Sequence, residues 1–113
     1  MRDFVFIEDV VSAYMKAIAH KDKLLGEVIN IGSAREYSVR EAVEKIISLS
    51  PYRVKPLWRG VLNPRIEPHR WQADITKARK LLGWSPMFTL EQGLKKSLEW
   101  FVENAGMYDG KKI

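Results

Sequence analysis

The stretch Trp71-Gln-Ala-Asp-Ile-Thr-Lys-Ala-Arg-Lys-Leu-Leu-Gly-Trp-Ser-Pro86 decides how the rest of the sequence is interpreted. Its apolar side chains recur at helical spacing and would share one face: Ile75, Ala78, Leu81 and Leu82. Either Asp74 or Thr76 can accept the free N–H groups of the first turn. Gly83 supplies the left-handed residue that ends a helix, and Pro86 prevents it from restarting. These residues predict a short capped helix packed against another part of the chain.

Three further helices are predicted on either side of this stretch. Apolar residues repeat at helical spacing from residue 10 to residue 18, after Glu8 and Asp9, which suit a helix N-terminus. Ser38-Val-Arg-Glu41 and Thr89-Leu-Glu-Gln92 are capping boxes, in which the first side chain caps the helix and the fourth reaches back. Each capping box precedes an apolar stripe, so each predicts the start of an amphipathic helix.

Three runs rich in β-formers predict short strands at residues 4–7, 27–31 and 53–58. The last run contains Pro56, which restricts it to a sheet edge. Residues 59–70 show no periodicity and predict a loop, and the tail at residues 106–113 is expected to fray. The sequence therefore predicts a mixed α/β fold, with about four helices and a few short strands, in one domain over residues 1–113. Trp58, Trp71, Trp84 and Trp100 are expected to pack inside it.

Composition narrows the function classes. With 46% hydrophobic and 29% charged residues, the 113-residue chain resembles an ordinary globular domain, and no run approaches the roughly 20 apolar residues of a membrane span. The absence of cysteine suits the cytoplasm, which is the expected location. The net charge of +5 is interleaved with acidic residues rather than gathered on one face. Such a distribution argues against nucleic-acid binding and is compatible with a diphosphate ligand.

Four motifs resemble one enzyme family in the family's own order. Residues 73–86 resemble "ADISKARRLLGWxP", Arg2-Asp-Phe-Val-Phe-Ile-Glu-Asp9 resembles "RDYVHVxD", and Val28-Ile-Asn-Ile-Gly32 resembles "xxNIG". Thr89-Leu-Glu-Gln-Gly-Leu94 follows where the family has its last helix. The family is that of the extended short-chain dehydrogenase/reductases, the NAD-dependent nucleotide-sugar epimerases and dehydratases, with UDP-glucose 4-epimerase as the best-known member. The resemblance covers only the back third of such an enzyme, its C-terminal substrate-binding domain.

The resemblance implies that NAD belongs to the full-length family and that this chain carries no cofactor site. No G-x-G-x-x-G turn occurs in the sequence. The single Tyr-x-x-x-Lys match, Tyr108 with Lys112, lies in the glycine-containing tail, so no catalytic residue is assigned. His20 and His69 lack the spacing of metal ligands, and no metal site is predicted.

By resemblance, four residues are candidates for binding a nucleotide-sugar, most closely a UDP-sugar. Arg2 opens the motif whose arginine reaches the nucleotide diphosphate in the family; the alternative is a surface ion pair of Arg2 with Asp3. Arg65 and Glu67 match the family's arginine on phosphate and carboxylate on ribose, although the spacing is one residue shorter. Arg70 competes with Arg65 for the phosphate. Arginine suits this role because its planar fork meets phosphate oxygens bidentately.

Three functions stay open at this point. The first is the nucleotide-sugar-binding portion of an NAD-dependent epimerase or dehydratase, inactive alone. The second is an interaction module that assembles with a separate chain carrying the Rossmann domain, and the third is a small basic nucleic-acid-binding protein. Without the rest of the enzyme, a strand edge and apolar helix faces would lose their cover, which predicts a homodimer or larger assembly.

Overall fold

The computed structural model describes residues 1–58 and 69–108. Over that part of the chain it contains four α-helices and two short 3-10 turns. The α-helices are α1 (Ile7–Ala19), α2 (Val39–Leu49), α3 (Thr76–Leu82) and α4 (Leu90–Glu103), and the turns are η1 (Lys21–Lys23) and η2 (Ala105–Met107). All four predicted helices are confirmed. The first begins at Ile7, inside the run expected to be a strand.

The helix termini form as their sequences predict. In both capping boxes the hydroxyl accepts the backbone N–H three residues ahead, and the side chain there accepts the N–H of the cap residue. At the start of α3, Asp74 Oδ1 accepts the N–H of Thr76 at 2.9 Å and so satisfies one N–H of the first turn; the N-cap residue Ile75 makes no side-chain cap bond. Gly83 ends α3 at φ 57° and ψ 33°, the left-handed conformation that glycine adopts without steric cost.

The three predicted strands do not form within residues 1–58 and 69–108, so the mixed α/β prediction is not confirmed for this part of the chain. The one β-type pairing there is an isolated antiparallel bridge between Arg2 and Tyr37, with N···O distances of 2.8 and 2.9 Å. Residues 27–31 and 53–58 belong to no helix and to no β-ladder. A strand requires a neighbouring strand to complete its hydrogen-bond ladder. The described residues offer these runs no such neighbour.

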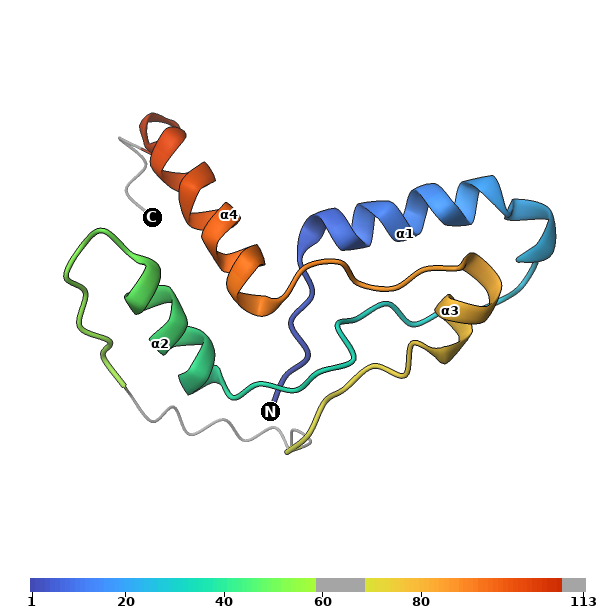
Figure 1. The fold of residues 1–113 in the computed structure, drawn as a ribbon, viewed down its shortest axis with the longest axis horizontal. Helices are drawn as coiled ribbons and strands as arrows, with labels where there is room; N and C mark the ends of the chain where they lie inside the picture. The colour runs from blue at the N-terminus through green and yellow to red at the C-terminus, as the bar shows by residue number, and fades with distance from the viewer. Residues whose placement is uncertain (59–68, 109–113) are drawn as a thin grey trace.

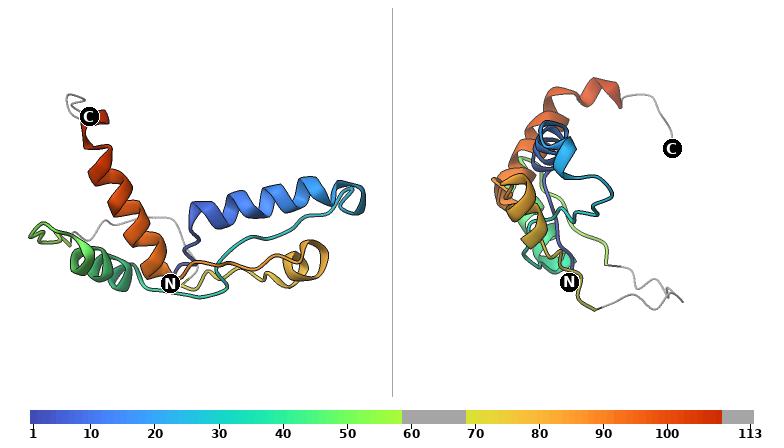
Figure 2. Two further views of the ribbon diagram at one scale, coloured as in Figure 1. Left: turned by 45° about the horizontal axis from the view of Figure 1, so that its top comes forward. Right: turned by 90° about the vertical axis from the view of Figure 1, so that its right-hand side faces the viewer.

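The helices form two pairs at opposite ends of an elongated molecule (Figure 1). α1 packs against α3 at one end, and α2 packs against α4 at the other. Extended segments run between the two pairs through the middle of the molecule, where the N-terminus also lies (Figure 2). The middle is therefore where residues from distant parts of the sequence meet.

The buried core is small and lies mainly between α1 and α3. It consists of Ala13, Ile75, Ala78, Leu82 and Trp84. Of the four tryptophans expected to pack, only Trp84 is buried, at 1% exposure, while the other three are exposed. The prediction that these three pack in the interior is therefore wrong, although Trp100 lies edge-on to Phe101 and Tyr108.

The molecule exposes more surface than a self-contained domain of its mass. Its accessible area is 9544 Å², whereas a monomeric protein of 13.1 kDa exposes about 6,400 Å². The radius of gyration is 17.3 Å, compared with about 13 Å for a compact domain of similar length. Within the described part of the chain, none of the helices has the length and apolar character that crossing a bilayer requires.

Candidate functional site

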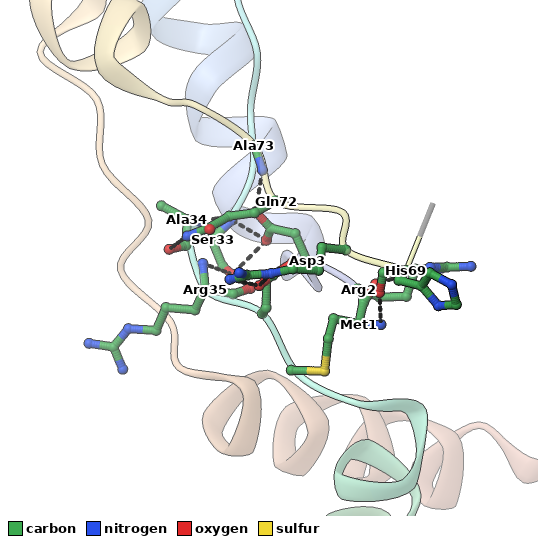
Figure 3. A network of polar contacts seen from close by, with 11 residues as sticks. Met1, Arg2, Asp3, Ser33, Ala34, Arg35, His69, Gln72 and Ala73 are labelled. Carbon is green, nitrogen blue, oxygen red and sulfur yellow. Dashed lines mark hydrogen bonds and ion pairs between the residues drawn. The ribbon is translucent and has the colours of Figure 1, made fainter. Parts of the chain in front are cut away.

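The carboxylate of Asp3 joins three segments in the middle of the molecule (Figure 3). Asp3 Oδ1 accepts the backbone N–H and the hydroxyl of Ser33 at 2.7 and 2.6 Å. Asp3 Oδ2 accepts the backbone N–H groups of Ala34 at 3.1 Å and Ala73 at 3.0 Å. Each of these hydrogen bonds has an ionised acceptor, the stronger kind in proteins. Asp3 therefore connects the beginnings of the motifs at residues 2–9 and 73–86 to the residues that directly follow the motif at 28–32.

Gly32 allows this junction to close. A Cβ atom at Gly32 would lie 2.6 Å from Ala73 Cβ and 2.8 Å from Asp3 Oδ2, closer than real side-chain atoms approach. In the sequence, Gly32 is only the last residue of the motif Val28–Gly32. The structural reason for a glycine here is the close approach of Asp3 and Ala73 to the backbone.

Arg2 lies on one side of the Asp3 junction. Its backbone pairs with Tyr37, and its guanidinium centre lies 5.6 Å from the centroid of the Trp71 ring, a cation–π distance. The amino group of Met1 donates to the carbonyl of His69 at 2.7 Å. These contacts bring residues 1–3 against residues 69–73. Asp3 itself accepts hydrogen bonds from Ser33, Ala34 and Ala73.

Arg70 is held by Glu36. Arg70 Nε and Nη2 both donate to Glu36 Oε2, at 2.8 and 2.6 Å. The Arg70 side chain is 78% exposed, whereas that of Glu36 is only 8% exposed. The hydrogen bond from Arg70 lowers the pKa of Glu36, with help from the Arg70 charge and the Trp71 backbone N–H, and burial opposes it. The same pairing raises the pKa of Arg70. Glu36 Oε1 is buried and has no hydrogen-bond partner.

The structure brings two of the four predicted ligand residues to neighbouring segments. Arg2 and Arg70 lie on segments that contact each other through the Met1–His69 hydrogen bond and the Arg2–Trp71 contact. Tyr37 pairs with the backbone of Arg2. Arg65 and Glu67 lie outside the described residues. Sequence reasoning missed Glu36, which is 34 positions away from Arg70 and belongs to no motif. No local pattern in the sequence could have revealed that pair.

A second carboxylate, Asp9, fixes α1 to the segment that leads into α4. Asp9 is 1% exposed, and its two oxygens accept the backbone N–H groups of Met87 at 2.8 Å and Phe88 at 3.1 Å. Trp84 Nε1 donates to the Asp9 carbonyl at 3.1 Å and to Ser12 Oγ at 2.8 Å. Asp9 therefore has a structural role, because its carboxylate and carbonyl oxygens accept the hydrogen bonds that fix α1 to residues 84–88.

The described residues contain no group of three or more potential metal ligands. Tyr108 is the last described residue of the chain, and Lys112, the other half of its Tyr-x-x-x-Lys match, lies outside the described residues. Arg2 and Arg70 are the two candidate ligand residues whose positions the structure describes.

The order of the capped helices, and the meeting of the motif segments around Asp3, are those of the C-terminal part of an extended short-chain dehydrogenase/reductase. The family model described as GDP-mannose 4,6 dehydratase matches residues 1–97. The chain belongs to this family of NAD-dependent epimerases and dehydratases, and the resemblance seen in the sequence is confirmed.

Relatives and solved structures support the same assignment. UDP-glucuronate 4-epimerase of Thermodesulfobacterium geofontis is 32% identical over 115 residues, covering 99% of this chain and 33% of the relative. The structure of epimerase Mth375 from Methanothermobacter thermautotrophicus superposes with a TM-score of 0.80 at 31% identity, over 93% of this chain and 31% of that one. Bordetella bronchiseptica WbmF, solved in complex with NAD+ and UDP, gives a TM-score of 0.73 at 29% identity, over 94% of this chain and 31% of that one. This chain thus spans about a third of each of these proteins.

Proposed function

We propose that this chain is the C-terminal, nucleotide-sugar-binding portion of an NAD-dependent epimerase or dehydratase of the UDP-glucose 4-epimerase type. The observation that supports this most directly is the meeting of residues 1–3 with residues 69–73 around Asp3. That meeting brings Arg2 close to the segment that carries Arg70. A UDP-sugar is the proposed ligand, since WbmF and UDP-glucose 4-epimerase of Bifidobacterium longum were solved with UDP.

In this proposal the four candidate residues contact different parts of the ligand, according to their charge. Arg2, with Arg65 or Arg70, meets the diphosphate, because a guanidinium presents two parallel N–H groups to phosphate oxygens. Glu67 accepts hydrogen bonds from the ribose hydroxyls. An excess of positive charge on the whole chain favours the approach of a dianionic ligand.

This portion does not catalyse the reaction alone. The sequence contains no glycine-rich dinucleotide turn and no Tyr-x-x-x-Lys pair within a predicted helix. In the complete enzyme, NAD would take a hydride from C4 of the sugar and, in an epimerase, return it. Both the NAD site and the acid–base pair belong to the other two thirds of the family fold.

A second candidate, an interaction module, is favoured by an apolar groove along α1. The groove has a volume of about 730 Å³, and its lining includes Val10, Tyr14, Ile18, Leu25 and Ile31. Tyr14, Ile18 and Leu25 are all more than half exposed. Exposed apolar surface of this kind is normally covered by protein. We propose that a Rossmann-bearing partner, or a second copy of this chain when it is isolated, covers it.

The nucleotide proposal is tested by amide NMR titration of the 113-residue chain with UDP and UDP-glucose, with NAD as the control ligand. Shifts should gather on Arg2 and residues 69–74, with NAD silent. Arg70→Ala should weaken UDP binding, whereas the matched Arg79→Ala on the surface of α3 should leave it unchanged. A well-dispersed spectrum that does not respond to either nucleotide would contradict the proposal for the isolated chain.

The assembly proposal is tested by light scattering and hydrophobic dye binding. The isolated chain should be a dimer or larger, and Ile18→Asp in the groove should dissociate it. Met87→Asp places the same charge at an exposed apolar residue away from the groove and should have no such effect. A monodisperse wild-type monomer that binds little dye would rule out the homodimer.

A further inference from the structure

We propose that Glu36 is a positioning residue, which holds the Arg70 guanidinium so that its outer edge receives a phosphate oxygen. This inference rests on the proposed function, which supplies the phosphate-bearing ligand and the role of Arg70 in binding it. The orientation of Arg70 is fixed before a ligand arrives.

The hydrogen bonds between the two side chains leave one edge of the guanidinium open. Arg70 uses Nε and one hydrogen of Nη2, and both donate to the same oxygen of Glu36. The opposite edge, formed by Nη1 and the second hydrogen of Nη2, remains for an acceptor. At 78% exposure the side chain is accessible to a ligand. An arginine this exposed would otherwise sample many rotamers and would lose that freedom on binding.

Glu36 is fixed firmly enough to act as the anchor. Its side chain is 8% exposed, and its backbone lies between two points of attachment. On one side, Ser33 and Ala34 are bonded to Asp3. On the other, Tyr37 pairs with the backbone of Arg2. Glu36 therefore orients Arg70 relative to the segment that carries Arg2.

A second contact holds the same two segments in register. Gln72 Nε2 donates to the carbonyl of Ala34 at 2.6 Å. The Arg70–Glu36 and Gln72–Ala34 contacts span the same pair of segments two residues apart on each. This arrangement keeps the backbone of residues 70–72 in place, so that the Glu36 contact controls the side chain of Arg70 rather than the path of the chain.

Positioning and simple electrostatics predict opposite effects for the removal of Glu36. Glu36 carries a negative charge next to a proposed anion site, so charge alone predicts tighter anion binding in Glu36→Ala. If Glu36 orients Arg70, Glu36→Ala instead weakens binding, by about two- to fivefold for a pair of this exposure. Glu36→Gln keeps a hydrogen-bond acceptor and should restore most of the affinity.

The experiment uses the 113-residue chain and inorganic pyrophosphate, followed through the Nε–Hε NMR signal of Arg70. We expect saturable shifts of that signal in the wild type, weaker binding in Glu36→Ala and near wild-type binding in Glu36→Gln. Glu27→Ala removes the same charge from the exposed Lys77–Glu27 pair and serves as the control; it should not weaken binding. In an Arg70→Ala background, Glu36→Ala should cause no further loss.

Unchanged or tighter pyrophosphate binding by Glu36→Ala would overturn the proposal. So would an Arg70 Nε–Hε signal that does not shift when pyrophosphate is added to the wild type. If Glu36→Ala does not fold, Arg70→Lys keeps the charge without the fork and should weaken binding; equal affinity would again refute positioning. Failure of the proposed function looks different. Pyrophosphate binding would follow the predicted order, but UDP would bind no better than pyrophosphate.

Discussion

The two ends of the molecule bury their apolar residues to different extents. At the α1–α3 end, Trp84 and Leu82 are almost fully enclosed. At the α2–α4 end, Ala42 is the one buried apolar side chain of α2, while Trp100 and Phe101 of α4 are exposed. Both ends are built from amphipathic helices. The difference shows that an amphipathic helix guarantees an apolar face, but not a partner to cover it.

The junction between the two ends is polar rather than apolar. Asp3 and Asp9 replace a central core by accepting backbone N–H groups from distant segments. Hydrogen bonds to a carboxylate are directional, so they fix the relative positions of segments even where little apolar surface is buried. This is how a chain with a small core keeps its motif segments together.

The largest difference in stability between the two ends is expected at Trp84. We expect Trp84→Ala to lower the free energy of unfolding by about 3–5 kcal/mol, because it leaves a cavity next to α1 and removes the indole N–H that donates to Asp9 O and Ser12 Oγ. Trp100→Ala, at an exposed position of α4, should cost about 1 kcal/mol or less. Urea unfolding followed by circular dichroism measures both. Equal losses would show that the two ends are equally well packed.

Asp9 should rank second, because it connects the α1–α3 end to the start of α4. Asp9→Asn places an amide NH₂ against one of the two N–H groups of Met87 and Phe88, and we expect it to cost about 2–3 kcal/mol. Asp22→Asn, at an exposed position in η1, is the control and should lie within about 0.5 kcal/mol of the wild type. The same urea experiment applies. If Asp9→Asn left the free energy of unfolding unchanged, the carboxylate would not be needed to hold this segment.

Gly32 tests the other carboxylate. Gly32→Ala introduces a Cβ within 3 Å of both Ala73 and Asp3, and we expect a loss of about 1–3 kcal/mol. Gly106→Ala in η2 meets nothing within 4 Å and should be close to neutral. Amide shifts in Gly32→Ala should spread to residues 33–34 and 69–74 while α3 stays unperturbed. Shifts confined to the mutated residue would show that the junction tolerates the methyl group.

The smallest expected effect is the pH dependence of the Arg70–Glu36 pair. Because the folded-state pKa of Glu36 is lowered, the pair stabilises the fold above the usual glutamate pKa, and this contribution is lost as the pH falls through the lowered value. The Arg70 Nε–Hε signal should therefore shift towards that of a free arginine only below the usual glutamate range. In Glu36→Gln the signal should be independent of pH over the same interval. A midpoint at the ordinary glutamate value would contradict the pairing.

Local sequence signals predicted the helices well. The capping boxes at Ser38 and Thr89, and the left-handed Gly83, all form as expected, because each depends on atoms within a few residues. The β-rich run at residues 27–31 failed as a strand prediction, since a strand depends on a ladder partner. Side-chain periodicity cannot show whether that partner is present.

The sequence by itself determined the family, the helix positions and the candidate arginines, because motifs and caps are encoded by neighbouring residues. Only the tertiary structure decided that Asp3 is a junction, that Gly32 must be small and that Glu36 holds Arg70. These contacts join residues 30 to 70 positions apart. Their geometry depends on the whole path of the chain, so no local pattern encodes it.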